Sequence, residues 1–276
     1  MISVLSTEGS TYSKVGNQML VNSLGDFRGM LSGGCLEGDL AERSKKVITN
    51  GISEVFTYDL RGDDDIFGLG VGCEGSITIL IQPLNKKNKY QPFRSLLENL
   101  EVSPNLESLP KNMDLNFDIS CIRAPVRILI LGAGIDVDPL VSFGILLGWD
   151  VSVSDYRPAF LNRLKENNDV KTFSIPHNNL DSELDLSRFD AAIVMSHNLI
   201  ADRSYLKILS KSSINFIGLL GPTQRKERIL KDLKLAGKSL DNRLRSPVGK
   251  KIGGRGPAAI ALEIAAELQS YFHTTK

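Results

Sequence analysis

Two cysteines in the first third of the chain stand inside glycine clusters: Cys35 in Ser32–Gly38 and Cys73 in Gly68–Gly75. A helix is expected to begin directly after Cys35, and the positive end of a helix dipole favours thiolate, the form that attacks electrophiles and binds metals. Glycine neighbours let a bulky ligand approach closely. Cys35 is therefore a candidate metal ligand, and Glu37 and Cys73 are further candidates for the same ligand-binding site. The alternative is that both thiols pack as small apolar groups.

A second candidate site lies where a predicted strand, Arg127–Leu131, runs into Gly132-Ala133-Gly134 and then a helix. Asp155 follows Gly134 by 21 residues and ends the next predicted strand. In the nucleotide-binding form of the doubly wound fold, amides at such a helix start attract phosphate, and the acid holds a ribose hydroxyl. The third glycine of this pattern is replaced by Val137, so a Rossmann-like fold that binds no dinucleotide is the alternative.

Two further groups of residues stand at similar places. His197 and Asn198 follow the predicted strand Ala191–Met195, at the carboxyl end where open α/β sheets bind ligands, and His197 can transfer a proton. Gly254 and Arg255 lie in a basic, glycine-rich stretch before the last predicted helix, which makes this stretch a candidate anion site. The alternatives are a structural histidine and a solvated connector.

The elements that must position these residues differ between the two ends of the chain. The first third predicts short strands and one helix, namely strands 18–21, 27–31, 55–60 and 76–81 and helix 36–50. After Pro125 strands and helices alternate, as strands 127–131, 151–154, 171–174, 191–195 and 215–219 and helices 139–147, 159–166, 202–210, 225–235 and 257–271. Such βα units predict a parallel, doubly wound sheet, because each parallel pair needs a crossover connection.

Length and charge support two domains. The chain has 276 residues and a net charge of +1, and 42% of its residues are hydrophobic. Residues 1–84 carry 6 basic and 11 acidic side chains, while the rest carries 27 and 21. We expect a small α+β domain over 1–84, a connector over 85–124 that includes one short helix at 93–100, and a Rossmann-like domain over 125–276. The near-neutral total argues against a nucleic-acid-binding protein.

Targeting and redox features are few. No apolar run reaches the ~18–20 residues that a membrane helix needs, and the first residues do not form a signal peptide. The three cysteines, Cys35, Cys73 and Cys121, form no CxxC pair and indicate no disulfide framework. We therefore expect a soluble, cytoplasmic protein with free thiols and no membrane association.

Taken in order, the motifs resemble those of the xanthine dehydrogenase accessory factor family (XdhC/CoxI). The resemblance covers nearly the whole chain. Its N-terminal part consists of Gly9–Tyr12, Gly33–Gly38, Tyr58–Leu60 and Gly68–Gly70 with Cys73. Its C-terminal part consists of Gly132–Gly134, Asp155–Pro158, His197-Asn198, Gly218–Pro222 and Ile252–Arg255.

This resemblance implies an accessory protein rather than an enzyme. Family members bind the molybdenum cofactor, a molybdopterin, protect it, and support its sulfuration with a cysteine desulfurase. They then insert it into the apo form of a molybdenum hydroxylase of the xanthine dehydrogenase type. The chemistry is compatible, because thiolate suits a soft metal centre and glycine loops suit a phosphate. Cys35 would then face the cofactor, and Arg255 would pair with its phosphate.

Two other functions remain open at this point. An NAD(P)-dependent oxidoreductase would use the Rossmann-like half, with Gly132, Gly134 and Asp155 around the nucleotide and His197 as the acid or base. A regulatory module would sense a nucleotide or the redox state through Cys35. A homodimer is compatible with any of these functions.

Overall fold

The computed structural model describes residues 1–61, 75–91, 94, 125–166, 169–233, 240 and 242–274. The chain divides into two compact units, Met1–Ala124 and Pro125–Lys276. Cys73, Cys121, most of the predicted connector and, apart from Arg94, the helix predicted at 93–100 lie outside the described residues. Among the described helices, none combines the length and the apolar character needed to cross a membrane.

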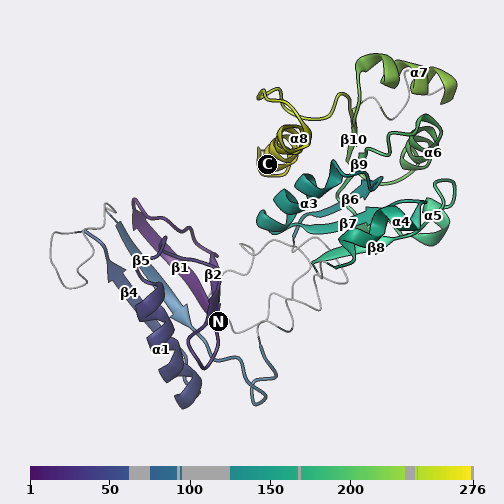
Figure 1. Ribbon diagram of the computed structural model, residues 1–276. Helices are drawn as coiled ribbons and strands as arrows, with labels where there is room; N and C mark the ends of the chain where they lie inside the picture. Colours follow the sequence, from purple (N-terminus) through teal and green to yellow (C-terminus); the bar gives the residue numbers. More distant parts are fainter. Residues whose placement is uncertain are drawn as a thin grey trace. The chain divides into compact units, whose positions relative to one another are not determined.

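The N-terminal unit is an antiparallel sheet with one helix packed on it (Figure 1). The strand order is β3-β2-β1-β5-β4. The strands are β1 (Ile2–Gly9), β2 (Gln18–Val21), β3 (Phe27–Arg28), β4 (Glu54–Asp59) and β5 (Gly75–Ile81), and the helix is α1 (Glu37–Asn50). β1 pairs with both β2 and β5, so it joins the short hairpin to the longer strands.

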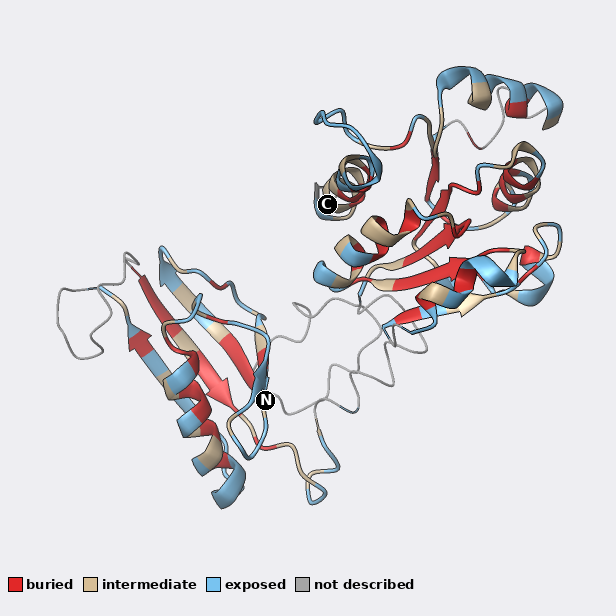
Figure 2. Ribbon diagram, viewed as in Figure 1, coloured by how far each residue is buried: buried red, intermediate tan, exposed pale blue. Residues whose placement is uncertain are grey.

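One side of α1 closes the core of this unit. Leu40 and Val47 lie one above the other on the helix and are fully buried, together with Ile2, Val4 and Ile79 from the sheet. Figure 2 shows this buried stripe of the helix facing the sheet and its exposed stripe facing away. The packing holds the first turn of α1, and therefore the Cys35 loop before it, against the sheet.

The C-terminal unit is a six-stranded parallel sheet with the order β11-β10-β9-β6-β7-β8 (Figure 1). Its strands are β6 (Arg127–Leu131), β7 (Asp150–Ser154), β8 (Val170–Phe173), β9 (Ala191–Val194), β10 (Phe216–Leu219) and β11 (Leu244–Arg245). The main helices are α3 (Val137–Leu146), α6 (Leu199–Leu209), α7 (Thr223–Leu233) and α8 (Pro257–Thr274). Shorter helices are α4 (Pro158–Leu161), η3 (Asn162–Leu164), α5 (Leu180–Glu183) and η4 (Leu186–Arg188).

Helices cover both faces of this sheet. Along β6, Ile128 and Ile130 belong to one buried cluster, which contains apolar residues of α3 and α8. The alternate residues Leu129 and Leu131 belong to a second cluster, which contains residues of α5, α6 and α7. The prediction of a doubly wound parallel sheet beside a smaller α+β unit is therefore confirmed. The strand order reverses between β6 and β9, where such folds bind their ligands.

Several elements differ from the sequence prediction, which does not include β11, α5 or η4. The strand predicted at 27–31 ends at Arg28, because the chain turns away at Gly29. The helix predicted at 159–166 is two short pieces, α4 and η3, since its hydrogen bonding changes at Asn162 from the α to the 3-10 pattern. The sequence does not predict β1, although this strand pairs with two others of its sheet.

Candidate functional site

The Cys35 loop is built around a buried carboxylate. Oε1 of Glu37 accepts hydrogen bonds from the amides of Leu31 and Ser32, both at 2.7 Å. Oε2 accepts the amide of Gly34 at 2.9 Å and the hydroxyl of Ser32. A carboxylate has about four acceptor positions, so this loop occupies all of them. Glu37 thus determines the conformation of the loop, and its predicted contact with a cofactor stays a prediction.

The charge of Glu37 is retained despite its burial. Burial raises the pKa of this carboxyl, but the hydrogen bonds from the Ser32 hydroxyl and from the backbone outweigh burial, and the pKa lies below its usual value. No ion pair to Glu37 occurs within the described residues. The loop is therefore held by a carboxylate whose charge is balanced by amide and hydroxyl dipoles alone.

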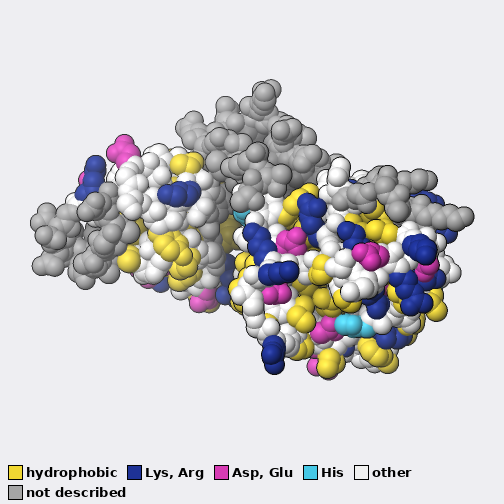
Figure 3. All heavy atoms as spheres, turned by 90° about the horizontal axis from the view of Figure 1, so that it is seen from above, with side chains coloured by type: hydrophobic (Ala, Val, Ile, Leu, Met, Phe, Trp, Pro, Cys, Tyr) yellow, Lys and Arg dark blue, Asp and Glu magenta, His cyan; other side chains and the backbone are white. Residues whose placement is uncertain are grey.

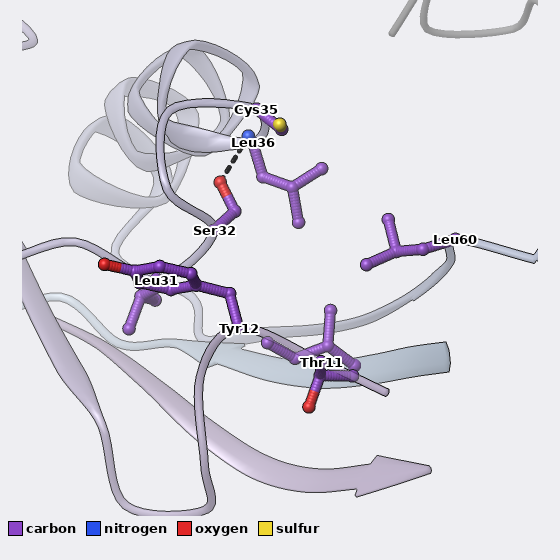
Figure 4. Close-up of a pocket in the computed structure, with 8 residues that line it drawn as sticks. Thr11, Tyr12, Leu31, Ser32, Cys35, Leu36 and Leu60 are labelled. Carbon is purple, nitrogen blue, oxygen red and sulfur yellow. Dashed lines mark hydrogen bonds between the residues drawn. The ribbon is translucent and has the colours of Figure 1, made fainter. Parts of the chain in front are cut away.

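Cys35 lies at a small pocket of about 10 Å³, which has room for about one water molecule. Figure 4 shows Thr11, Leu36 and Leu60 directed toward the pocket, with the Cys35 sulfur at its rim. The hydroxyl of Thr11 donates to the carbonyl of Ser13, and the Ser32 hydroxyl accepts the amide of Leu36 at 2.6 Å. The described lining of the pocket therefore offers a ligand apolar surface, one partly exposed thiol and the exposed side chain of Tyr12.

In the C-terminal unit, Gly132 is required by packing between two loops. Its φ is +118°, and a Cβ there would lie 2.6 Å from the carbonyl oxygen of Met195 and from Cα of Ser196. The chain after β6 thus lies directly against the chain after β9, at the point where the strand order reverses. This contact explains the glycine without a bound dinucleotide.

Asp155 also bonds to groups of the protein itself. Its carboxylate is fully buried and accepts the amide of Ala133 at 2.7 Å, the amide of Arg157 at 2.8 Å, and two guanidinium hydrogen bonds from Arg157 at 2.8 and 2.9 Å. Burial raises the pKa of Asp155, but these hydrogen bonds, led by Arg157, outweigh it and hold the pKa below its usual value. With four accepted bonds the acceptor positions of Asp155 are filled by groups of the protein, and its predicted contact with a ribose hydroxyl stays a prediction.

Arg163 occupies the other side of the glycine loop. Its guanidinium donates to the carbonyls of Ala133 and Gly134, at 3.0 and 2.5 Å, and to both carboxylate oxygens of Asp138 at 2.9 Å. Asp138 belongs to the first turn of α3, so the helix start that would face a pyrophosphate carries an acidic side chain. The Gly132–Gly134 loop is therefore packed by groups of the protein itself.

His197 forms a hydrogen-bonded pair with Asp136 at the carboxyl edge of the same sheet. Its Nε2 lies 2.7 Å from Oδ2 of Asp136, and its side chain is 58% exposed. The φ of His197 is +58°, a left-handed conformation that is uncommon outside glycine and asparagine. The imidazole is thus oriented by a carboxylate at the carboxyl edge of the sheet, where it can exchange a proton with solvent or a ligand.

Asn198 caps α6. Its side-chain oxygen accepts the amides of Ile200 and Ala201 at 2.9 and 3.2 Å, and its side-chain nitrogen donates to the hydroxyl of Tyr156 at 3.2 Å. These bonds satisfy amides that a helix start leaves without partners. The side chain of Asn198 is therefore committed to the fold.

The late basic loop is held by α8. The amides of Ile252 and Gly253 both donate to Oε1 of Glu263 at 3.0 Å, so a carboxylate of the chain occupies the predicted anion site at these amides. Gly254, with a φ of +122°, lies next in the loop. Arg255 is exposed, and no described residue forms an ion pair with it.

Two groups of predicted residues are thus each brought together, Cys35 with Glu37 and Gly132 with Asp155. Sequence reasoning missed Arg157 and Arg163, which saturate the second group. The spacing Asp155-Tyr156-Arg157 was a usable signal for Arg157, since an arginine near the acid of this fold can accept a phosphate. No pattern in the sequence connects Arg163 to the glycine loop.

The geometry defines a class of protein: an α+β unit with a thiol in a pocket, joined to a Rossmann-like unit whose glycine loop is filled internally. Comparison with known families is more specific. Residues 128–268 match the model of the XdhC Rossmann domain, and residues 1–59 match that of the XdhC and CoxI family. The chain belongs to the XdhC family.

Individual relatives agree with this assignment. A probable xanthine dehydrogenase subunit of Bacillus subtilis is 28% identical, over 97% of this chain and 91% of the relative. The molybdenum cofactor insertion chaperone PaoD of Escherichia coli is 23% identical, over 98% of this chain and 82% of the relative. A crystal structure of a xanthine dehydrogenase from Bacillus halodurans has a TM-score of 0.80 and 26% identity, and covers 100% of this chain and 92% of that one.

Proposed function

We propose that this protein binds the molybdenum cofactor, protects it, supports its sulfuration by a cysteine desulfurase, and inserts it into an apo molybdenum hydroxylase of the xanthine dehydrogenase type. Similarity to a molybdenum cofactor insertion chaperone over 98% of the chain supports this role. This similarity covers residues of both units, so it supports a role for the whole chain rather than for one unit alone.

The observation that carries the proposal is the Cys35 pocket. Thiolate is a ligand of choice for soft metal centres. At this pocket the thiol is partly exposed beside buried apolar side chains, while both neighbouring hydroxyls are engaged elsewhere. Sulfur would then be the soft donor that a metal centre meets at this pocket. The partly exposed thiol fits a metal centre held through Cys35, with Glu37 maintaining the conformation of the loop.

Taken by itself, the C-terminal unit offers an exposed basic loop. We propose that Gly254 and Arg255 of this loop contribute to binding an anionic group of a ligand. His197 would donate or accept a proton at the same edge of the sheet. An NAD-dependent oxidoreductase is less well supported, because the oxygens of Asp155 that would accept the ribose 2′-hydroxyl already accept hydrogen bonds from Ala133 and Arg157.

Co-purification tests the proposal. The full chain is produced in a bacterial host that makes the cofactor, and molybdenum is measured together with the fluorescent pterin oxidation product. We expect both to elute with the parent protein, and retention to fall at least about tenfold in Cys35→Ala, because a metal–thiolate contact is lost.

Cys121→Ala is the matched control, since Cys121 lies outside both glycine clusters. It should retain cofactor as the parent does. A parent protein that elutes with neither molybdenum nor pterin would refute the proposed function. Equal retention by folded Cys35→Ala and Cys121→Ala would instead remove Cys35 from the site.

A further inference from the structure

The guanidinium of Arg157 is fixed in place far more firmly than an ordinary surface arginine. Its backbone amide, Nε and Nη2 all donate to the carboxylate of Asp155, at 2.8, 2.9 and 2.8 Å. That carboxylate is fully buried, whereas the Arg157 side chain is 30% exposed. The bidentate pair therefore fixes the plane of the guanidinium while leaving part of it at the surface.

Two aromatic rings also lie close to this guanidinium. The guanidinium carbon lies 3.8 Å from the ring centroid of Phe160 and 5.0 Å from that of Tyr156. Arginine stacks on aromatic rings in this way, and the contact limits rotation of its side chain. Little conformational entropy would then be lost when a ligand binds.

One edge of the guanidinium remains available. Nη1 carries two donors, and no residue in the described part of the chain accepts a hydrogen bond from it. Arg163, six positions along, is a useful contrast, because its nitrogens are taken up by Asp138 and by backbone carbonyls. Lysine and arginine side chains are numerous on the surface in Figure 3, so charge alone does not single out Arg157.

The position of Arg157 is that of a ligand contact. It follows β7, which neighbours β6 in the sheet, so it lies at the carboxyl edge close to the reversal of strand order. In this fold the acid after the second strand holds a ribose hydroxyl, and an arginine nearby accommodates a phosphate instead. Here the acid is consumed in holding the arginine, which leaves the arginine as the residue that can face a ligand.

We propose that Arg157 binds a phosphomonoester group at the carboxyl edge of the C-terminal sheet, with Asp155 as its positioning residue. The phosphate can come from the molybdenum cofactor, in which case the identity of the ligand rests on the proposed function, or from the 2′ position of NADP(H). Both sources present the same dianionic group to Nη1, and the experiment separates them.

Two measurements on the full chain test the proposal. The first is cofactor retention, read from the fluorescent pterin product. The second is a fluorescence titration with NADPH and with NADH, which lacks the 2′-phosphate. We expect Arg157→Gln to weaken binding of the phosphomonoester ligand by about 10- to 100-fold, the range for a lost charged hydrogen bond. The affinity that remains should fall less steeply with salt.

Arg188→Gln is the control, because it removes the same charge from an exposed arginine that precedes β9, at the opposite edge of the sheet. It should bind as the parent does. If Arg157→Gln unfolds, the double change Asp155→Asn with Arg157→Gln replaces it, since that variant leaves no charge unpaired. Thermal melting verifies that each variant is folded.

The outcomes are distinct. Loss of pterin from Arg157→Gln identifies the cofactor phosphate as the ligand, and tighter binding of NADPH than NADH that disappears in Arg157→Gln identifies the 2′-phosphate. Parent-like pterin retention together with parent-like NADPH binding in Arg157→Gln overturns the inference while leaving the proposed function intact. A parent protein without cofactor refutes the proposed function, and the NADPH titration then decides the inference alone.

Discussion

The Cys35 loop and the Gly132 loop are both held by a buried carboxylate, but they expose different functional groups. In each loop a buried carboxylate, Glu37 or Asp155, accepts four hydrogen bonds from its own surroundings. Glu37 is held by amides and a hydroxyl and leaves a thiol at an apolar pocket. Asp155 is held largely by an arginine and leaves a cation at the surface. One unit therefore offers a soft donor and the other an anchored positive charge.

This difference shows what a glycine-rich loop before a helix does and does not indicate. The motif indicates a tight turn with exposed amides, which is compatible with an anion site. Whether those amides are available depends on the side chains that reach them from elsewhere in the chain. In both loops a carboxylate of the protein accepts hydrogen bonds from the loop amides.

Alanine at Gly132 and at Gly34 gives the sharpest test of the packing difference. Both glycines have positive φ, +118° and +112°, so either substitution strains the backbone by about 1–3 kcal/mol. At Gly132 the new Cβ would also meet the backbone of Met195 and Ser196, whereas at Gly34 nothing lies within 4 Å. Urea unfolding should show a loss about 2 kcal/mol larger for Gly132→Ala. Equal losses would mean that the two loops are packed alike.

Substitution of the two carboxylates should give the next largest loss of stability. Glu37→Gln and Asp155→Asn each replace one acceptor oxygen by a donor, so each should lower the free energy of unfolding of its unit by about 2–4 kcal/mol. The Asp155 change should be partly rescued by adding Arg157→Gln, which removes the unpaired cation. The Glu37 loop contains no such ion pair among the described residues. A double variant as unstable as Asp155→Asn alone would contradict the ion-pair account.

The pH dependence should be similar in the two units. The pKa of Glu37 and that of Asp155 are both lowered on folding, because the hydrogen bonds to each charged form outweigh its burial. The stability they contribute is fully present above the unfolded carboxyl pKa of about 4 and is lost as the pH falls through the folded values. Thermal melts between pH 7 and pH 3 should therefore show a weaker acid dependence in Glu37→Gln and Asp155→Asn than in the parent.

Asn198 gives the smallest expected effect. Asn198→Ala removes the cap of α6 and should cost about 1 kcal/mol, the usual loss for such a cap. Cofactor retention should be unchanged, because among the described residues the side chain bonds to the helix and to Tyr156. A cofactor loss that exceeds the loss of stability would restore Asn198 as a ligand contact.

Most of the parallel half could be predicted from the sequence, but β11, α5 and η4 were not predicted. The predicted strands are short apolar runs, most of them followed by a helical pattern, so local spacing determines these elements and their parallel arrangement. β6, for example, has the predicted bounds Arg127–Leu131. β1 was missed because Ile2–Gly9 has only a brief apolar start, and its place in the sheet depends on pairing with Gly75–Ile81, far along the chain.

The sequence predicted where the candidate site residues lie, but not which groups they bond to. The sequence placed Cys35 and Asp155 in turns beside helices or strands, and the structure has them there. It could not show that Glu37 would fold back onto Leu31 and Ser32, or that Arg157 would saturate Asp155. Hydrogen-bond partners of buried groups are chosen by the tertiary fold, where several donors compete for the same oxygen atoms.

Delivery of cofactor by the parent and by Cys35→Ala tests the central claim most directly. Each protein, loaded in the cell and purified, is mixed with an apo xanthine dehydrogenase-type hydroxylase, and the xanthine oxidation that appears is measured. The account predicts activity with the parent and with Cys121→Ala, and less than about a tenth of it with folded Cys35→Ala. Full activity with folded Cys35→Ala would contradict the claim that the thiol at this pocket holds the cofactor.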